Sequence, residues 1–198
     1  MKKWLEEITL EGSKVKLIPL TASYRNELVK ASDDGELWKL WFTSVPSEKN
    51  IDDYIQQALN DMNNGLALAF VVIDKKNNKV VGSTRYCNAV PSHRRVEIGY
   101  TWYSKSVQRT SINTECKQLL LTHAFEKLNA IAVEFRTHWH NHASRNAIER
   151  LGAKQDGVLR NHWVDDSGML RDTVVFSIIQ SEWKTVKQSL SYKLGLFS

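Results

Sequence analysis

The sequence predicts a mixed α/β fold, of the α+β kind, built around one central sheet. Helical spacing of apolar residues comes early, strand-like segments follow, and one long helical pattern lies between two strands near the centre. No internal repeat, low-complexity segment or linker interrupts the 198 residues. Because a chain of this length can bury a substantial core, we expect a single domain over residues 1–198.

The helices are predicted from apolar spacing and from the residues that end each pattern. Residues 47–65 carry apolar side chains at helical intervals and finish on Asn-Asn-Gly. A second helical face stops at Asn129, and Gly152 suits the C-cap of a shorter helix. The expected helices are residues 21–32, 36–42, 47–65, 114–128 and 142–152, with a helix-like segment at the end of the chain.

The strands are predicted from apolar runs and from alternation. Residues 66–74 and 79–88 flank a Lys-Lys-Asn-Asn turn, the pattern of a hairpin. Residues 94–103 alternate, which predicts one face with Val96, Ile98, Tyr100 and Trp102 and another with Glu97, Gly99, Thr101 and Tyr103. The expected strands are residues 14–20, 66–74, 79–88, 94–103, 131–139 and 170–179.

Composition narrows the functional classes. With 42% hydrophobic and 25% charged residues the chain is typical of soluble globular proteins, and we expect no membrane association. The net charge of +5 is mild, and no block of like charges suggests a nucleic-acid-binding arm. Two cysteines cannot form a disulfide framework and the N-terminus lacks a secretory signal, so we expect a cytoplasmic protein.

A polar loop runs directly into the start of the central helix. Residues 106–113 are short, polar and irregular, and the helical period begins at Thr114. The first turn of a helix presents backbone N–H groups without intrahelical acceptors, and the helix dipole adds partial positive charge there. The loop is therefore a candidate anion cradle, with Arg109 as a charged contact, although a simple capping role fits it as well.

The order of these segments resembles the GNAT acetyltransferase superfamily, and most closely its branch of ribosomal-protein-type N-terminal acetyltransferases. The resemblance rests on four segments in this order: EIGYTW, INTECKQLLLTHAF, NHASRNAIERLGAKQDGVLR and RDTVVFSII. It implies a mixed, mostly antiparallel sheet that splays between its fourth and fifth strands, with helices on both faces. It also implies acetyl-CoA as cosubstrate, with no metal.

The resemblance implies two sets of cofactor-binding residues. In the family, loop amides hold the pyrophosphate of coenzyme A, and backbone groups of the fourth strand bind the pantetheine arm. Here Ser111 stands where glycine is usual in that loop, and Asn113 replaces a small residue. The loop set is Gln108, Arg109, Thr110, Ser111, Ile112, Asn113 and Thr114, and the strand set is Ile98, Gly99, Tyr100, Thr101 and Trp102.

The catalytic candidates come from the same resemblance. Glu97 is the expected general base, acting through water, and the alternative is a structural carboxylate paired with Arg95 or Arg136. The position of a general-acid tyrosine in many relatives is Ile148 here, which cannot donate a proton.

The segment from Asn141 to Ser144 fits the pattern of the ribosomal-protein branch. Ser144 would then donate to the departing thiolate, and Asn141 would bind the pantetheine arm. The alternative is that either residue simply caps the following helix.

The acceptor side is less defined. Trp38, Trp41 and Phe42 lie where early helices roof the substrate groove in this family, and packing in the core is the alternative. His140 or His142 could compete with Glu97 as base, whereas His138, His140 and His142 lack the geometry expected of a metal site.

The leading prediction is an N-acetyltransferase that moves the acetyl group of acetyl-CoA directly to a primary amine through a ternary complex. The acceptor is either a protein N-terminus or a small molecule. The alternative is a catalytically weak or inactive CoA-binding regulator on the same fold. Edge strands and the C-terminal SYKLGLFS segment are compatible with a homodimer, and nucleic acid is not an expected partner.

Overall fold

The computed structural model describes residues 3–165 and 167–196. The outermost residues of the predicted domain, including the last two of SYKLGLFS, lie outside this part. Eight strands form one mixed sheet in the order β1-β2-β3-β4-β5-β6-β8-β7. The strands are β1 Leu10–Glu11, β2 Val15–Pro19, β3 Leu68–Asp74, β4 Lys79–Val90, β5 Arg95–Tyr103, β6 Ala132–His138, β7 Lys154–Val164 and β8 Leu170–Ile179.

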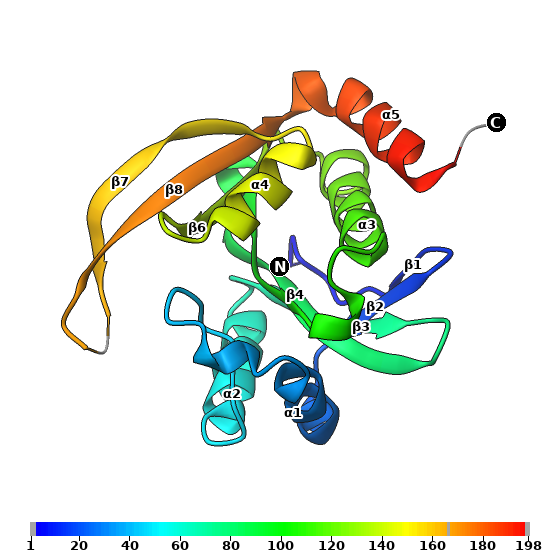
Figure 1. The fold of residues 1–198 in the computed structure, drawn as a ribbon. Coiled ribbons are helices and arrows are strands. Elements are labelled where there is room, and N and C mark those ends of the chain that lie inside the picture. Colours follow the sequence, from blue (N-terminus) through cyan, green and yellow to red (C-terminus); the bar gives the residue numbers. More distant parts are fainter. Residues whose placement is uncertain (1–2, 166, 197–198) are drawn as a thin grey trace.

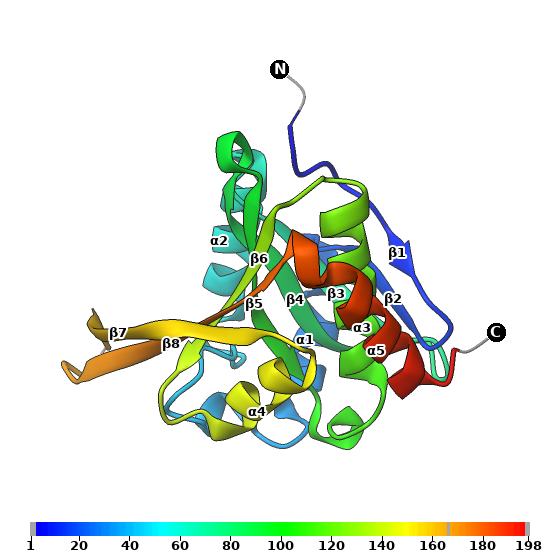
Figure 2. The same cartoon turned by 90° about the horizontal axis from the view of Figure 1, so that it is seen from above.

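Helices cover both faces of the sheet, which confirms the predicted fold class. In Figure 1, α1 and α2 lie below the sheet, and α3, α4 and α5 lie above it. Strands β7 and β8 form a long hairpin that extends away from the body of the molecule (Figure 2). The helices are α1 Arg25–Asp33, α2 Ile51–Asn63, α3 Ile112–Glu126, α4 His142–Arg150 and α5 Trp183–Leu194. None of these helices has both the length and the apolar character needed to cross a membrane.

The sheet splays between β5 and β6, as predicted for the fourth and fifth strands of the family; the short β1 shifts the numbering by one. These two strands pair in parallel only over Arg95–Glu97 and Ala132–Glu134, whereas every other neighbouring pair is antiparallel. Beyond Glu97 the edge of β5 that faces β6 has no strand partner. The gap exposes backbone polar groups that would otherwise be paired within the sheet.

The predicted alternation of β5 is wrong beyond Gly99 because the strand contains a bulge. Ser83 of β4 lies opposite Trp102, but Arg85, two residues on, lies opposite Gly99, so β5 carries one extra residue. Tyr100 occupies this position with a φ of +50°, a left-handed conformation that is uncommon outside glycine.

The bulge exchanges the two faces of the strand. Thr101 accepts a hydrogen bond from Lys117 of α3, and Trp102 donates one from Nε1 to the Tyr54 hydroxyl of α2 (3.3 Å). Trp102 therefore points to the opposite face from Ile98, which lies beside Tyr86 on the α3 side. The alternation of residues in the sequence does not reveal where a single inserted residue shifts the strand register.

Other element predictions need correction. Residues 36–42 do not form a helix, because Gly35 and Glu36 have positive φ and only Leu37–Lys39 make a single 3-10 turn. Helix α1 begins at Arg25 after a 3-10 turn, and α3 begins at Ile112, two residues earlier than predicted. The sequence allowed a second strand near the end of the chain but did not locate the edge strand β7, because most of its side chains are exposed and it is held by backbone pairing to β8.

Candidate active site

A cavity of about 750 Å³ opens where β5 and β6 diverge. Its wall comes from segments far apart in sequence: residues 37–45, β5, the loop after β5, β6 and α4. It brings together most of the residues predicted from sequence, although their roles stay predictions. The predicted residues that line it are Phe42, Ile98, Gly99, Tyr100, Thr101, Trp102, Gln108, Arg109, Thr110, Asn113, Asn141 and Ser144.

Side-chain hydrogen bonds hold the loop after β5 in place, whereas the last backbone amides before α3 are free. At the start of the loop the Ser104 hydroxyl donates to the Ala31 carbonyl (2.8 Å), and the Thr110 hydroxyl donates to the Val107 carbonyl (2.7 Å). Within the described residues, the N–H groups of Arg109, Thr110 and Ser111 have no hydrogen-bond acceptor. These free amides and the first turn of α3 form a concentration of backbone donors at the cavity wall.

Ser111 adopts a conformation that any residue reaches. Its φ is −75° and its ψ is −7°, and the left-handed residue of the loop is Arg109 with a φ of +61°. The Ser111 hydroxyl lies 2.8 Å from Lys14 Nζ, which donates to it from the β1–β2 turn. The position therefore needs glycine neither for its backbone angles nor to keep a side chain out of the cavity. The side chains of Ile112 and Thr114 are buried, so they too turn away from the cavity.

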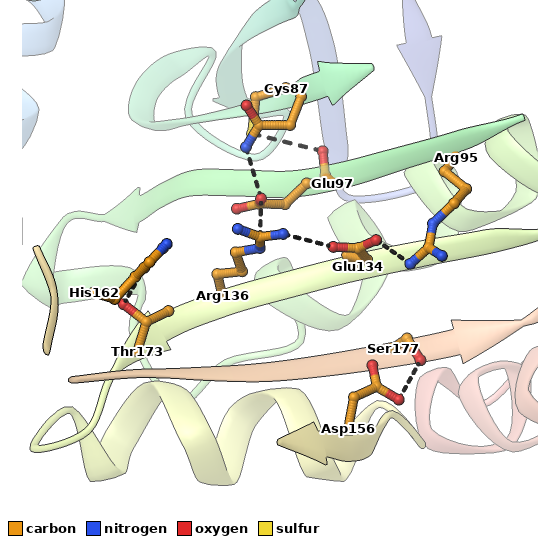
Figure 3. A network of polar contacts seen from close by, with 10 residues as sticks. Cys87, Arg95, Glu97, Glu134, Arg136, Asp156, His162, Thr173 and Ser177 are labelled. Atoms are coloured by element: carbon orange, nitrogen blue, oxygen red, sulfur yellow. Dashed lines mark hydrogen bonds and ion pairs between the residues drawn. The ribbon is translucent and has the colours of Figure 1, made fainter. Parts of the chain in front are cut away.

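Glu97 lies just before the free edge of β5 and is 7% exposed. Its Oε2 accepts a hydrogen bond from Asn88 Nδ2 (2.8 Å) and lies 3.4 Å from Arg136 Nε (Figure 3). Arg136 also donates to Glu134, which in turn pairs with Arg95. The pairing with Arg136 that the sequence allowed is thus present, whereas Arg95 pairs with Glu134 instead of Glu97.

Burial raises the pKa of Glu97, and the hydrogen bond from Asn88 and the charge of Arg136 partly oppose the shift. A carboxylate with a raised pKa is a stronger proton acceptor near neutral pH than a solvated one. Gly99 gives this carboxylate its room, since a Cβ there would lie only 3.1 Å from Glu97 Oε1. Glu97 itself does not line the cavity, so it would reach a reacting amine through water.

At the start of α4, Asn141 caps the helix, whereas Ser144 leaves its hydroxyl free in the cavity. Asn141 is the N-cap, because its Oδ1 accepts a hydrogen bond from the Ser144 N–H (3.0 Å). The Ser144 hydroxyl makes no hydrogen bond with any described residue and lines the cavity. One turn further on, Ile148 also lines the cavity and offers no proton donor.

Lys117 is a cavity residue that the sequence analysis missed. Its side chain is 5% exposed, and Nζ donates to Thr101 Oγ1 (2.6 Å) and Thr84 Oγ1 (3.2 Å). Burial lowers the pKa of this lysine to about 8. The sequence could have indicated this residue, because Lys117 lies beside Cys116 and Leu120 on the apolar face of α3. Burying a charged side chain there costs free energy unless the charge finds a partner.

The aromatic residues of the acceptor side do not form core. Trp38 and Trp41 are 39% and 60% exposed, so the alternative of core packing is wrong for both, and of the three predicted aromatics only Phe42 lines the cavity. Trp41 packs edge-on against His138, with ring centres 5.0 Å apart, and lies 5.7 Å from His140. These three rings form a wall outside the cavity.

The charged residues that line the cavity are all cationic. They are Arg109, Lys117, Arg136, Arg150 and Arg171, with no aspartate or glutamate among the described residues of the lining. A cavity of this charge with free amides at one end suits an anionic ligand.

Comparison with known proteins settles the family. Residues 14–154, well over half of the chain, match the family model described as an acetyltransferase (GNAT) domain. The chain belongs to the GNAT acetyltransferase family.

This GNAT chain is similar to named acetyltransferases in sequence and to solved acetyltransferases in structure. It is 34% identical over 95 residues to the putative ribosomal N-acetyltransferase YdaF of Bacillus subtilis, an alignment that spans 48% of this chain and 51% of that protein. A GCN5-related N-acetyltransferase from Brucella melitensis superimposes with a TM-score of 0.85 at 31% identity, covering 98% of this chain and 87% of that one. RimJ of Mycobacterium smegmatis, solved in complex with CoA-disulfide, shares the fold with a TM-score of 0.79 at 18% identity, covering 96% and 95%.

The histidines of this acetyltransferase do not assemble a metal centre. His138 and His140 are neighbours, with ring centres 5.6 Å apart, and the His140 N–H donates to His138 Nδ1 (3.0 Å). In the described part of the chain, no three His, Cys, Asp or Glu side chains are placed to hold a metal ion. His140 does not line the cavity, so its role as a competing base stays a prediction.

Proposed function

We propose that this chain transfers the acetyl group of acetyl-CoA directly to a primary amine, within a ternary complex and without a covalent enzyme intermediate. The observation that carries the proposal is the splayed cavity, which has free loop amides in its wall and the buried Glu97 carboxylate directly before the stretch of β5 that lines it. The acceptor would be a protein N-terminus or a small-molecule amine. The name of the YdaF relative makes ribosomal proteins a reasonable source of candidate N-termini.

The residues present fit coenzyme A, which supplies the thioester that makes the acetyl group transferable. The amides of Arg109 to Ser111, the start of α3 and the Arg109 guanidinium would hold the pyrophosphate. The unpaired edge of β5 beyond Glu97 offers backbone donors and acceptors for the amide-rich pantetheine arm. RimJ, a fold neighbour, was solved with a CoA disulfide.

The chain would contribute to the reaction in three ways. Glu97 accepts a proton from the incoming ammonium through a water molecule, and its raised pKa favours this step. Backbone N–H groups near Tyr100 stabilise negative charge on the carbonyl oxygen. The free hydroxyl of Ser144 donates a hydrogen bond to the departing sulfur.

The cysteines favour direct transfer over a covalent route. Burial raises the pKa of Cys116 to about 12, and burial together with the Glu97 charge raises that of Cys87. Both thiols are free and buried, and neither lines the cavity. A thiol held in its protonated form is a poor nucleophile, so neither is suited to carry the acetyl group.

Two-substrate kinetics test the proposal. With acetyl-CoA varied at several fixed concentrations of a peptide or small amine, we expect reciprocal plots that intersect, as a ternary complex requires. Parallel lines would contradict direct transfer. CoA binding without turnover across a broad panel of amines would instead support the alternative, a catalytically inactive CoA-binding regulator. The presence of Ile148 in place of a general-acid tyrosine favours that alternative.

A further inference from the structure

Arg171 is a cavity-lining arginine whose charge the proposed chemistry does not use. It lies on β8 opposite Trp163 of β7, close to the turn that joins the two strands of the hairpin. Its Nε is inaccessible to solvent and has no hydrogen-bond partner, and its guanidinium makes no ion pair with any described residue. By contrast, Arg136 in the same cavity is paired with both Glu97 and Glu134.

Among the described residues, no carboxylate forms an ion pair with Arg171. Asp165 acts on it from beyond ion-pair distance, and that carboxylate already accepts hydrogen bonds from Ser167 and Met169. Arg171 is half-buried, and burial lowers the pKa of its guanidinium, whose Nε has no hydrogen-bond partner among the described residues. An unsatisfied buried donor has a free-energy cost that a bound anion would remove.

The position of Arg171 is at the acceptor end of the cavity. His138 of β6 lies opposite Thr173, and Arg171 precedes Thr173 by two residues on β8, so Arg171 and Thr173 lie on the same face of the sheet. The charge of Arg171 contributes to the lowered pKa of His138, after burial, and the His138 ring packs against Trp41. The pyrophosphate loop lies across the splay, beyond β5.

We propose that Arg171 binds a carboxylate carried by the acceptor, so that the preferred substrate is an amine with an acidic group close to the reacting nitrogen. Either the α-carboxylate of a free amino acid or an acidic residue next to a peptide N-terminus supplies this chemistry. Polyamines and lysine-rich N-termini are excluded by the same argument, because every charged residue that lines the cavity is cationic. The inference rests on the proposed function, since it names the acceptor of that transfer.

Binding measurements test this inference separately from turnover. C-terminally amidated Ser-Glu-Glu, Ser-Gln-Gln and Ser-Lys-Lys, together with free glutamate, are titrated calorimetrically into protein saturated with CoA and into protein without it. We expect Ser-Glu-Glu or free glutamate to bind at least about tenfold more tightly than Ser-Gln-Gln, the gain of one charge-assisted contact, and Ser-Lys-Lys to bind least. Whichever of the two acidic probes binds more tightly identifies the source of the carboxylate.

Three variants connect the preference to Arg171. In Arg171→Gln the preference for the acidic probe should vanish, and in Arg171→Glu it should reverse in favour of Ser-Lys-Lys. Arg160→Gln is the control, because Arg160 lies on the same hairpin, is 79% exposed and pairs with Asp172 outside the cavity. The reversal is a gain of binding, so it cannot be produced by partial unfolding.

The outcomes that would overturn the Arg171 inference differ from those that would overturn the proposed function. Equal binding of acidic and neutral probes, absence of binding by every probe, or a preference that survives Arg171→Gln would overturn the inference. Failure of CoA to bind would overturn the proposed function instead, and the titrations without CoA would still report on Arg171. An acidic amine that binds through Arg171 but is not acetylated would contradict the transfer reaction while leaving the carboxylate site intact.

Discussion

The two ends of the cavity are built in different ways. At the loop end the proposed binding groups are mainly backbone: the free amides of Arg109 to Ser111 and the first turn of α3. At the acceptor end they are side chains from the irregular segment 37–45, from β6 and from β8, including Phe42 and Arg171. Backbone groups do not change when side chains are substituted, so, apart from the guanidinium of Arg109, the loop end should tolerate sequence change that the acceptor end does not.

This difference explains why Ser111 is compatible with the loop end. Its side chain pairs with Lys14 outside the cavity, while its N–H stays free. At the acceptor end the identity of Arg171 decides the local charge. We therefore expect relatives with the same loop geometry to differ in the amine they accept.

The largest effect should come from Glu97, which lies between the two ends. Glu97→Gln removes the proton acceptor but preserves shape, so kcat/KM for acetyl transfer should fall roughly 10²- to 10³-fold with CoA affinity unchanged. In the wild type, kcat/KM should rise as pH increases through the raised pKa of Glu97, because only the deprotonated carboxylate accepts a proton. That component of the pH profile should be missing in the variant.

Glu134→Gln is the matched control, since Glu134 also contacts Arg136 but lies further along the ion-pair chain. It should change kcat/KM only slightly. Similar losses in both variants would show that the network is structural and that Glu97 has no separate role in proton transfer.

Lys117 should couple stability to alkaline pH. The folded protein loses this proton near pH 8, whereas the unfolded chain keeps it to about 10.5. Between these values the unfolded state binds more protons, so the free energy of unfolding should rise with pH by up to about 1.4 kcal/mol per unit. In Lys117→Met, Thr84 and Thr101 can still hydrogen-bond each other, and urea titrations from pH 7 to 10 should lack this contribution. An identical pH dependence in wild type and variant would refute the assignment.

The start of α4 offers a smaller and more local test. Asn141→Ala removes the side chain that caps the Ser144 N–H and should lower the free energy of unfolding by about 1 kcal/mol, whereas Asn141→Ser should retain most of it. Ser144→Ala should leave stability unchanged, because its hydroxyl has no partner in the described structure, and should lower kcat. Chemical denaturation and initial rates distinguish the two residues, and a destabilised Ser144→Ala would contradict the division of roles.

Ser111→Gly should have the smallest effect. Glycine gains nothing at a φ of −75° and adds freedom to the unfolded chain, so stability should fall by about 0.5–1 kcal/mol. CoA affinity should remain within about twofold of wild type, because the free amide of residue 111 is present in both proteins. Markedly tighter binding by the glycine variant would show that Ser111 does obstruct the loop.

The parts of the fold and site that the sequence predicted are those that local pattern encodes. The hairpin of β3 and β4, the helical period of α3 and the cap at Asn141 follow from periodicity and residue type over short spans. The resemblance of the ordered segments to the GNAT superfamily then implied the splayed sheet and the role of the loop at its edge.

The parts that were missed depend on tertiary context. The bulge at Tyr100 is a single-residue change of register, and β7 is fixed by pairing with β8 more than by its own composition. The contacts of Lys117 with Thr84 and Thr101 join residues on three elements, and no local pattern specifies them.

The central claim is that the loop end of the cavity binds coenzyme A, and a calorimetric titration of CoA tests it most directly. We expect one site of roughly micromolar affinity in the wild type. Affinity should be at least about tenfold weaker in Arg109→Asn, which tolerates the left-handed backbone but removes the guanidinium. Arg145→Gln is the control, because Arg145 lies on α4 against Trp139 and does not line the cavity. Undetectable binding by the wild type, or equal affinity in Arg109→Asn, would contradict the account.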